Sequence, residues 1–354
     1  MTPKSEVTMQ LSCPVPASRF DKIQLGHGSG GRMTNELIAE RFMPRVSNDT
    51  LEQLGDAAII TLGRETLAMS TDTFVVKPLE FPGGDIGVLA IHGTVNDISM
   101  MAARPRYITI GFVLEEGLPM ELLDRVVTSM AHAASMAGVT IVAGDTKVVE
   151  RGKADGMFIN TTGIGTLHPA CRPGPTRAAP GDMILISGPI ARHGMAVMAA
   201  RGDLDFEAEI TSDTANLYPM VASLADAFGD AIHVLRDPTR GGVASALNEI
   251  AVASKVGMVL EEDALPIDDA VIAACEMLGL DPLYVANEGT LVAIVRRDVA
   301  GSALEVMHTH ALGHGAVLVG EVTDSHKGTV VTKTSLGGTR IVDLLPGEQL
   351  PRIC

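Results

Sequence analysis

Short apolar runs rich in β-branched residues alternate along the chain with longer stretches of helical periodicity. In the first half, the runs bounded by turn residues predict strands at 57–62, 67–76, 107–114, 140–143 and 157–165. Apolar residues spaced three or four apart predict helices at 85–103 and 120–137. This interleaving of strands and helices indicates an α/β fold of the mixed α+β kind.

A proline-rich segment at 168–180 interrupts the pattern and predicts a boundary between two domains, because it can continue neither a helix nor a strand. Beyond it we expect strands at 183–187, 258–261, 284–286, 291–295, 317–322 and 330–334. Helices are expected at 194–200, from 242 to about 254, at 268–278 and at 299–310. The chain thus divides into a flexible N-terminal extension (1–21), an N-terminal domain (22–168), a C-terminal α/β domain (176–344) and a mobile, exposed tail (345–354).

Composition narrows the class of protein. The chain has 354 residues and a formal net charge of −16, which argues against a general nucleic-acid or membrane-surface binder. No run of about 18 apolar residues predicts a transmembrane helix, and the first residues do not resemble a secretory signal, so we expect a cytoplasmic protein. Cys13, Cys171, Cys275 and Cys354 form no CxxC pair, so neither a disulfide framework nor a zinc site is predicted.

A glycine-rich loop, Gly26-His-Gly-Ser-Gly-Gly-Arg-Met33, is the first candidate for binding chemistry. It nearly matches a Walker A loop, but Arg32 and Met33 stand where lysine and serine or threonine are required. The backbone amides of Gly28, Gly30 and Gly31, with the charge of Arg32, are suited to binding phosphate. A glycine-rich turn without a ligand explains the loop equally well.

Four acids stand at the ends of apolar elements, which is where residues can converge on a pocket. They are Asp56, Asp72, Asp97 and Asp145. Carboxylates that converge beside phosphates are typical Mg²⁺ ligands, so we expect a metal–nucleotide site, although each acid taken singly is as well explained as a cap or turn residue.

Further polar residues accompany these acids. His92 and Asn96 lie four apart on one helix face, and Thr146 and Lys147 follow Asp145 directly. A buried structural histidine is the alternative for His92. Arg240 precedes two glycines and a predicted helix, a pattern that suits an anion site or an ordinary loop.

Glu288 and Cys354 are the candidate reactive residues. Glu288 lies in Asn-Glu-Gly between apolar runs, where burial would raise the pKa of its carboxyl toward that of a useful base, with Lys147 assisting. Cys354, on the proline-containing tail beside Arg352, is a candidate partly activated thiolate. The alternatives are an ion pair between domains for Glu288 and an accidental exposed thiol for Cys354.

Seven segments of the sequence together resemble the HypE family of hydrogenase maturation factors. They are GHGSGG, STDTFVVKPLEFPGGDIG, HGTVNDISMM, VAGDTKVVERG, RDPTRGGV, ANEG and the final PRIC. That family belongs to the aminoimidazole ribonucleotide synthetase-like, ATP-dependent superfamily. The resemblance covers residues 22–354 and implies a two-domain PurM-like fold, with ATP binding in the N-terminal domain and a homodimer formed through the β-sheet of that domain.

The resemblance also implies the chemistry. Such proteins accept a carbamoyl group on the final cysteine from HypF, use ATP with Mg²⁺ to dehydrate it to a thiocyanate, and pass the cyano group to iron held by HypC and HypD. It implies catalytic roles for Cys354, Glu288, Lys147 and His92. Roles in binding ATP are implied for Gly28, Gly30, Gly31, Arg32, Asn96, Thr146 and Arg240, and roles in binding Mg²⁺ for Asp56, Asp72, Asp97 and Asp145. The alternatives are a synthetase or kinase of the same superfamily that acts on a free small molecule, and a non-enzymatic scaffold.

Overall fold

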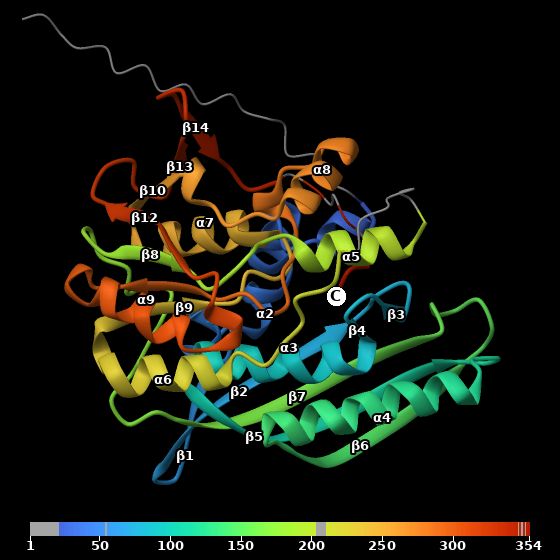
Figure 1. The fold of residues 1–354 in the computed structure, drawn as a ribbon. Coiled ribbons are helices and arrows are strands. Elements are labelled where there is room, and N and C mark those ends of the chain that lie inside the picture. Colours follow the sequence, from blue (N-terminus) through green and yellow to red (C-terminus); the bar gives the residue numbers. More distant parts are fainter. Residues whose placement is uncertain (1–20, 54, 203–209, 346, 348–349, 351) are drawn as a thin grey trace, which may run out of the picture.

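The computed structural model describes residues 21–53, 55–202, 210–345, 347, 350 and 352–354, and two large β-sheets form its frame (Figure 1). Among the described residues, the first sheet has the strand order β1-β2-β7-β5-β6. Its strands are β1 (Ala58–Leu62), β2 (Glu65–Phe74), β5 (Ala103–Glu115), β6 (Thr140–Val149) and β7 (Met157–Leu167). β5 and β6 run parallel because α4 (Met120–Ala137) crosses over between them.

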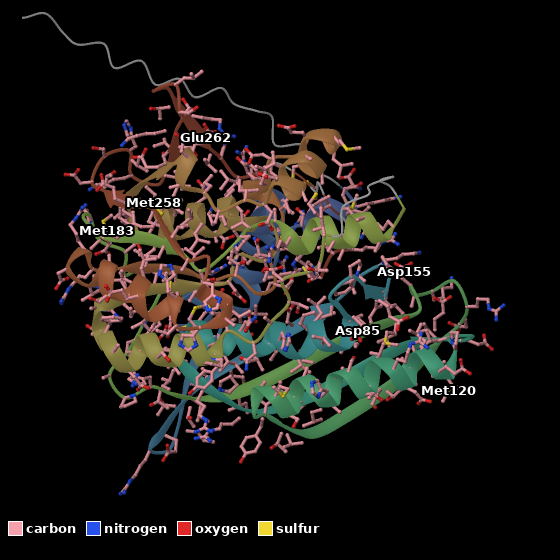
Figure 2. The ribbon with its side chains drawn as sticks, viewed as in Figure 1. Asp85, Met120, Asp155, Met183, Met258 and Glu262 are labelled. Carbon is pink, nitrogen blue, oxygen red and sulfur yellow. The ribbon has the colours of Figure 1, made fainter. Side chains whose placement is uncertain are left out.

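Helices α3 (Ile86–Met100) and α4 cover one face of this sheet. Asp85 caps α3 by accepting hydrogen bonds from the amides of Gly87 (2.7 Å) and Val88 (2.9 Å), and is labelled in Figure 2. Ser70 and Phe74 on β2 alternate with exposed Thr71 and Thr73, so one face of the sheet is buried and the other is open.

The second sheet, of seven strands in the described chain, has the order β14-β13-β10-β12-β8-β11-β9. Its strands are β8 (Met183–Ile186), β9 (Ile232–Arg236), β10 (Gly257–Glu261), β11 (Val292–Val295), β12 (Val317–Thr323), β13 (Val330–Lys333) and β14 (Thr339–Val342). On one face, α7 (Gly242–Ser254) packs into an apolar core; on the other lie α6 (Tyr218–Phe228) and α9 (Ala300–His308). Helices α5 (Arg192–Ala200) and α8 (Asp269–Leu278) form a smaller cluster beside them.

Several expected elements differ in the structure. The helix expected at 85–103 ends at Met100, because Ala102 adopts a positive φ of 51° and Ala103 already begins β5. The strand expected at 284–286 is wrong: a 3-10 turn, Pro282–Tyr284, occupies its start. The pattern missed α6, β9 and β14. Residues 1–20, most of the expected extension, lie outside the described residues.

The glycine-rich loop packs against the second half of the chain rather than against the first sheet. Gly30 has φ +75°, and a Cβ there would lie 2.8 Å from the carbonyl oxygen of Arg240. The amide of Arg32 donates to the carbonyl of Leu345 at 2.9 Å. The loop is therefore placed at the joint between the two halves. The short helices α1 (Arg32–Leu37) and α2 (Met43–Val46) follow it.

Asn96 on α3 also joins the halves. Its side-chain amide is buried and donates to the carbonyls of Ala215 (3.0 Å) and Glu288 (3.3 Å), and its oxygen accepts from the amide of Leu217 (2.9 Å). No helix in the described part of the chain is long and apolar enough to cross a membrane.

Candidate functional site

Three carboxyl groups from distant parts of the sequence meet at the joint. Asp56 precedes β1, Asp97 lies on α3 and Asp237 follows β9, and one oxygen from each lies within 4.8 Å of the others. Arg236 pairs with Asp56 at 2.9 Å, and the Ser70 hydroxyl donates to Asp97 at 2.6 Å. One carboxyl oxygen of Asp237 is buried without a hydrogen-bond partner. We call Asp56, Asp97 and Asp237 the acidic cluster.

Burial determines the protonation of the acidic cluster. Burial, with a smaller contribution from neighbouring carboxylates and against the opposing charge of Arg236, raises the pKa of Asp56 to about 6 and that of Asp237 to about 8. The pKa of Asp97 is also raised, by burial first and then by the charges of Asp237, Asp72 and Asp56. A divalent cation would remove this repulsion and supply the partner that Asp237 lacks, so the cluster fits Mg²⁺, a cation that prefers oxygen ligands.

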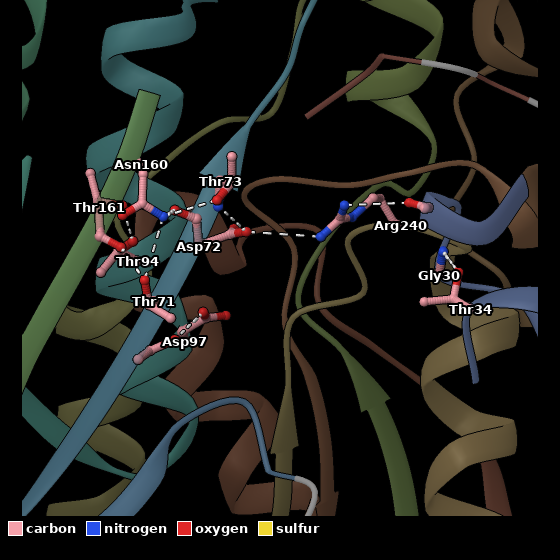
Figure 3. A network of polar contacts seen from close by, with 12 residues as sticks. Gly30, Thr34, Thr71, Asp72, Thr73, Thr94, Asp97, Asn160, Thr161 and Arg240 are labelled. Atoms are coloured by element: carbon pink, nitrogen blue, oxygen red, sulfur yellow. Dashed lines mark hydrogen bonds and ion pairs between the residues drawn. The ribbon is translucent and has the colours of Figure 1, made fainter. Parts of the chain in front are cut away.

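Asp72 and Arg240 extend the site toward the glycine-rich loop (Figure 3). The guanidinium of Arg240 lies 3.8 Å from the Asp72 carboxylate and donates to the carbonyl of Gly28 at 3.4 Å. Thr34, just after the loop, accepts a hydrogen bond from the Gly30 amide at 3.0 Å. A cation and a glycine loop beside an acidic cluster are what a metal-bound polyphosphate requires.

Cys354 lies in a cavity of about 230 Å³ whose lining includes Gly28, Gly31, Arg240 and Ile353. The carboxyl of Glu288 is close enough for its charge to act on the thiol. Burial, together with the negative charges nearby, raises the pKa of this thiol well above its usual range, although Arg240 lowers it. The expectation of a partly activated thiolate on an exposed tail is therefore wrong for this arrangement: Ile353 is 3% exposed, and the Arg352 guanidinium pairs with Asp155 at 2.7 Å.

Glu288 is buried, as expected, and burial raises the pKa of its carboxyl well above the usual range. Its backbone is fixed by Asp213, whose carboxylate accepts hydrogen bonds from the amides of Glu288 (3.2 Å) and Gly289 (2.9 Å). One oxygen of the Glu288 carboxyl is buried without a partner. The group is thus held in place and still has an oxygen available for a proton.

Asp145, Thr146 and Lys147 do not join this site within one chain. Their strand, β6, is the exposed edge of the first sheet, where Lys147 pairs with Asp145 at 2.5 Å. The strand of Asp145 lies three positions from the strand of Asp72 in the first sheet, which is about 14 Å at the usual spacing between strands. The strand register also places the Asp145 side chain on the opposite face of the sheet. Among the described residues, the cation that acts on Glu288 is Arg240. Two expectations fail within one chain: a metal ion shared by Asp72 and Asp145, and assistance of Glu288 by Lys147.

Three other expected residues take positions that change their interpretation. All hydrogen-bonding atoms of the Asn96 side chain are used on the backbone of the second half, so it is a joint residue and has no donor left for ATP. Arg32 pairs with Asp343 at 3.0 Å, so its charge is not directed at the acidic cluster. His92 lies 3.4 Å from the Thr214 hydroxyl, and burial lowers its pKa to about 4, so it is neutral.

Sequence reasoning missed Asp237 as a member of the acidic cluster, Arg236 as its neighbour in the site and Asp213 as the anchor of Glu288. Asp237 stood beside Arg240 in a motif already considered for anion binding, but no spacing rule connects it with Asp56 and Asp97. Asp213 lies in a stretch without periodicity.

Comparison with known proteins agrees with this architecture. The N-terminal domain of the AIR synthase related proteins matches residues 54–167, and the C-terminal domain matches residues 179–333. The chain is 51% identical to the carbamoyl dehydratase HypE of Cupriavidus necator over 98% of this chain and 99% of that protein. It is 46% identical to that of Escherichia coli over 95% of this chain and 100% of that protein. A crystal structure of HypE in complex with ATP, 50% identical, superposes with a TM-score of 0.79 over 94% of this chain and 100% of that one.

A two-domain frame of two sheets with an acidic site at their joint thus defines an AIR synthase related protein. Thiamine monophosphate kinase, at 16% identity and a TM-score of 0.63, shares the fold. Within this class, the chain belongs to the HypE family of carbamoyl dehydratases.

Proposed function

We propose that this protein is an ATP-dependent carbamoyl dehydratase that converts an S-carbamoyl group on Cys354 into a thiocyanate. The observation that carries the proposal is the position of Cys354 in a cavity bordered by the glycine-rich loop and Arg240, with Glu288 close enough for its charge to act on the thiol. The relatives named carbamoyl dehydratase match nearly the whole chain. A reactive cysteine carried by its own chain reaches this cavity as an intramolecular reactant, which raises its effective concentration.

The chemistry divides into two steps. The carbamoyl oxygen attacks the γ-phosphorus of ATP, ADP leaves, and one N–H proton is lost, so that a poor leaving group becomes a phosphate ester. The second N–H proton then passes to a base as the C–O bond breaks, giving S–C≡N and inorganic phosphate. Glu288 is our candidate for this base, because its charge acts on the thiol that carries the group and its carboxyl has an oxygen without a partner.

Asp56, Asp97 and Asp237 are the residues that would hold Mg²⁺, with Asp72 beside them. The metal ion would neutralise the phosphate charge. Gly28 and Gly31 would supply backbone amides, whereas the amide of Gly30 already donates to Thr34. Arg240 would supply a positive charge beside the phosphates.

Partners follow from the family. A HypE–HypF complex is known for a relative 50% identical to this chain, with a TM-score of 0.83 over 87% of this chain and 99% of that one. We propose HypF as the carbamoyl donor and a HypC–HypD complex as the acceptor of the cyano group. Both exchanges require the tail to leave the cavity, so we also keep the proposal that the tail is mobile.

A homodimer is the proposed assembly. β6 lies at the edge of its sheet with nine of its ten residues exposed, including Ile141 at 41%, Val142 at 54% and Val148 at 67%. A long exposed edge with apolar side chains is normally covered by a partner. Asp145, Thr146 and Lys147 lie on this strand, so any role of theirs in catalysis has to be exercised across the interface of the dimer.

The test is intact-mass analysis after incubation with HypF, carbamoyl phosphate, ATP and Mg²⁺. Our proposal predicts the gain of a carbamoyl group and then the loss of one water, both absent in Cys354→Ala. Turnover of ATP on a free small molecule, with no change in the mass of the protein, would instead indicate a synthetase or kinase. No ATP turnover at all would leave the scaffold interpretation.

A further inference from the structure

The described end of the tail lies along α5. A Cβ on Gly194 would come within 3.3 Å of the Leu350 side chain, so the absence of a side chain at Gly194 gives the tail room to approach the helix. The carbonyl of Ile353 lies 2.8 Å from Nε2 of His193, at the start of the same helix. The tail is thus held by its backbone as well as by its side chains.

The carbonyl one residue earlier is held in the same way. The guanidinium of Arg201, just after α5, donates to the carbonyl of Arg352 at 2.6 Å, and the amide of Lys77 donates to it at 3.1 Å. Asp155, labelled in Figure 2, pairs with both the Arg352 guanidinium (2.7 Å) and Lys77 (3.1 Å). Two consecutive carbonyls therefore have dedicated donors from outside the tail.

The chemistry of the His193 ring fits this contact. A carbonyl oxygen can only accept, so the hydrogen of the neutral ring lies on Nε2, and Nδ1 accepts from the Ser212 hydroxyl at 2.8 Å. The Ser212 oxygen in turn accepts from the amide of Thr214 at 3.1 Å. The edge of Phe81 packs against the ring at 5.3 Å and 87°. The contacts with Ser212 and Phe81 come from outside the tail and orient the ring, and the Ile353 carbonyl selects the tautomer.

We propose that His193 is a positioning residue, which together with Arg201 sets the register of the tail and so places the Cys354 sulfur against Glu288. His193 does not touch the sulfur, so it acts through the Ile353 carbonyl. The consequence for the chemistry rests on the proposed function, but the docking of the tail does not.

Docking is tested by the alkylation rate of Cys354 with iodoacetamide, followed by intact mass in a Cys13→Ser background, with Cys354→Ala as the blank. The partly buried thiol with a raised pKa reacts slowly, so the rate reports the fraction of undocked tail. His193→Phe keeps a ring but removes the donor, and should raise the rate roughly 5- to 30-fold, the equivalent of one buried hydrogen bond. His193→Gln retains a donor at the same reach and should restore most of the protection.

The matched control is His308→Phe, because Nε2 of His308 also lies 2.8 Å from a backbone carbonyl, that of Ala316, at a place remote in sequence from the tail. This variant should leave the alkylation rate unchanged. Arg201→Met, a change at the surface, provides a second variant that should fold and should also raise the rate. The proposal would be overturned if Arg201→Met and a folded His193→Phe both kept the wild-type alkylation rate of Cys354. It would also be overturned if His193→Phe and His308→Phe raised that rate equally.

A second measurement separates positioning from general stability. After carbamoylation by HypF, single-turnover dehydration should be slower in His193→Phe than in wild type, with ATP affinity unchanged and with recovery in His193→Gln. If the wild-type protein shows no dehydration, the proposed function fails, while the alkylation result still decides whether His193 docks the tail.

Discussion

The thiol of Cys354 and the carboxyl of Glu288, 66 positions apart in sequence, lie so close at the joint of the two sheets that the charge of Glu288 adds to the effect of burial in raising the pKa of the thiol. The pKa of each group is raised, chiefly by burial, which favours the protonated form of both. The thiol form is less nucleophilic than the thiolate. A group attached to the sulfur would replace the thiol proton and meet the carboxyl directly.

Glu288→Gln should leave ATP binding and carbamoylation of Cys354 near normal and slow the dehydration by about 10²- to 10⁴-fold, the usual contribution of a general base. Intact-mass analysis would then show the carbamoylated protein accumulating. Normal formation of the thiocyanate by this variant would remove Glu288 from the mechanism.

The dehydration rate should also rise with pH. A base must be deprotonated to act, and the pKa of Glu288 is raised, so the rate should increase through a pH range above that of an ordinary glutamate. Single-turnover measurements on carbamoylated wild-type protein would show this. A rate that is flat from acid to neutral pH would argue against a buried carboxyl as the base.

Asp237→Asn should change stability in opposite directions with and without Mg²⁺. The folded-state pKa of Asp237 is raised from 3.8 to about 8, so its contribution to stability is fully present below pH 3.8 and is lost as the pH rises to about 8. At pH 8 without metal, the variant should therefore have a higher Tm than wild type.

With Mg²⁺ present, the wild type should gain stability, and more at pH 8 than at pH 6, because binding displaces protons from the acidic cluster. Asp237→Asn should lose most of this gain, and Asp298→Asn, an exposed partner of Arg296, should keep it. Thermal unfolding with and without Mg²⁺ measures both effects. An equal response to Mg²⁺ in all three proteins would exclude the acidic cluster as the metal site.

Asn96→Ala should lower the free energy of unfolding by about 2–4 kcal/mol, because it leaves buried backbone groups of the second half without partners. Denaturant unfolding would measure the loss. Under conditions where the variant remains folded, ATP affinity should be close to that of wild type. A stable variant with weakened ATP binding would restore the original interpretation of Asn96 as a nucleotide ligand.

Val142→Asp should shift the proposed homodimer toward monomer, because it places a charge on the exposed edge strand β6. Light scattering at several concentrations would show the change. Met277→Asp on α8, at a similarly exposed apolar position, is the control and should not alter the mass.

Much of the frame could be predicted because β-branched alternation and helical periodicity are local signals. α4 has the bounds expected from its pattern. β14 and the turn at Pro282–Tyr284 could not be predicted in the same way, since segments of three or four residues without a clear period take their conformation from the elements beside them. α6 did carry a signal in the sequence, because Asn216 stands two residues before the pair Tyr218 and Pro219. The side-chain oxygen of Asn216 accepts a hydrogen bond from the Tyr218 amide at 3.0 Å.

The site was predictable only where motifs are local. Asp56 and Asp97 come together, as expected of carboxylates that converge on one pocket. Asp237 and His193 could not be assigned from spacing, because their partners belong to the other half of the chain or to its tail. Lys147, by contrast, was included in the predicted site although the structure places it elsewhere within the chain. It follows Asp145 closely in sequence, yet alternation along β6 and three strand spacings keep both away from Asp72.

The joint built by Asn96 and the acidic cluster has a consequence for how the protein can evolve. Since Asp56 and Asp97 come from one half and Asp237 from the other, any substitution that shifts the packing of the two halves also shifts the distances between these oxygens. The two halves are therefore expected to accumulate substitutions in concert, and a chimera that combines halves from two distant relatives should fold each sheet yet bind the metal poorly.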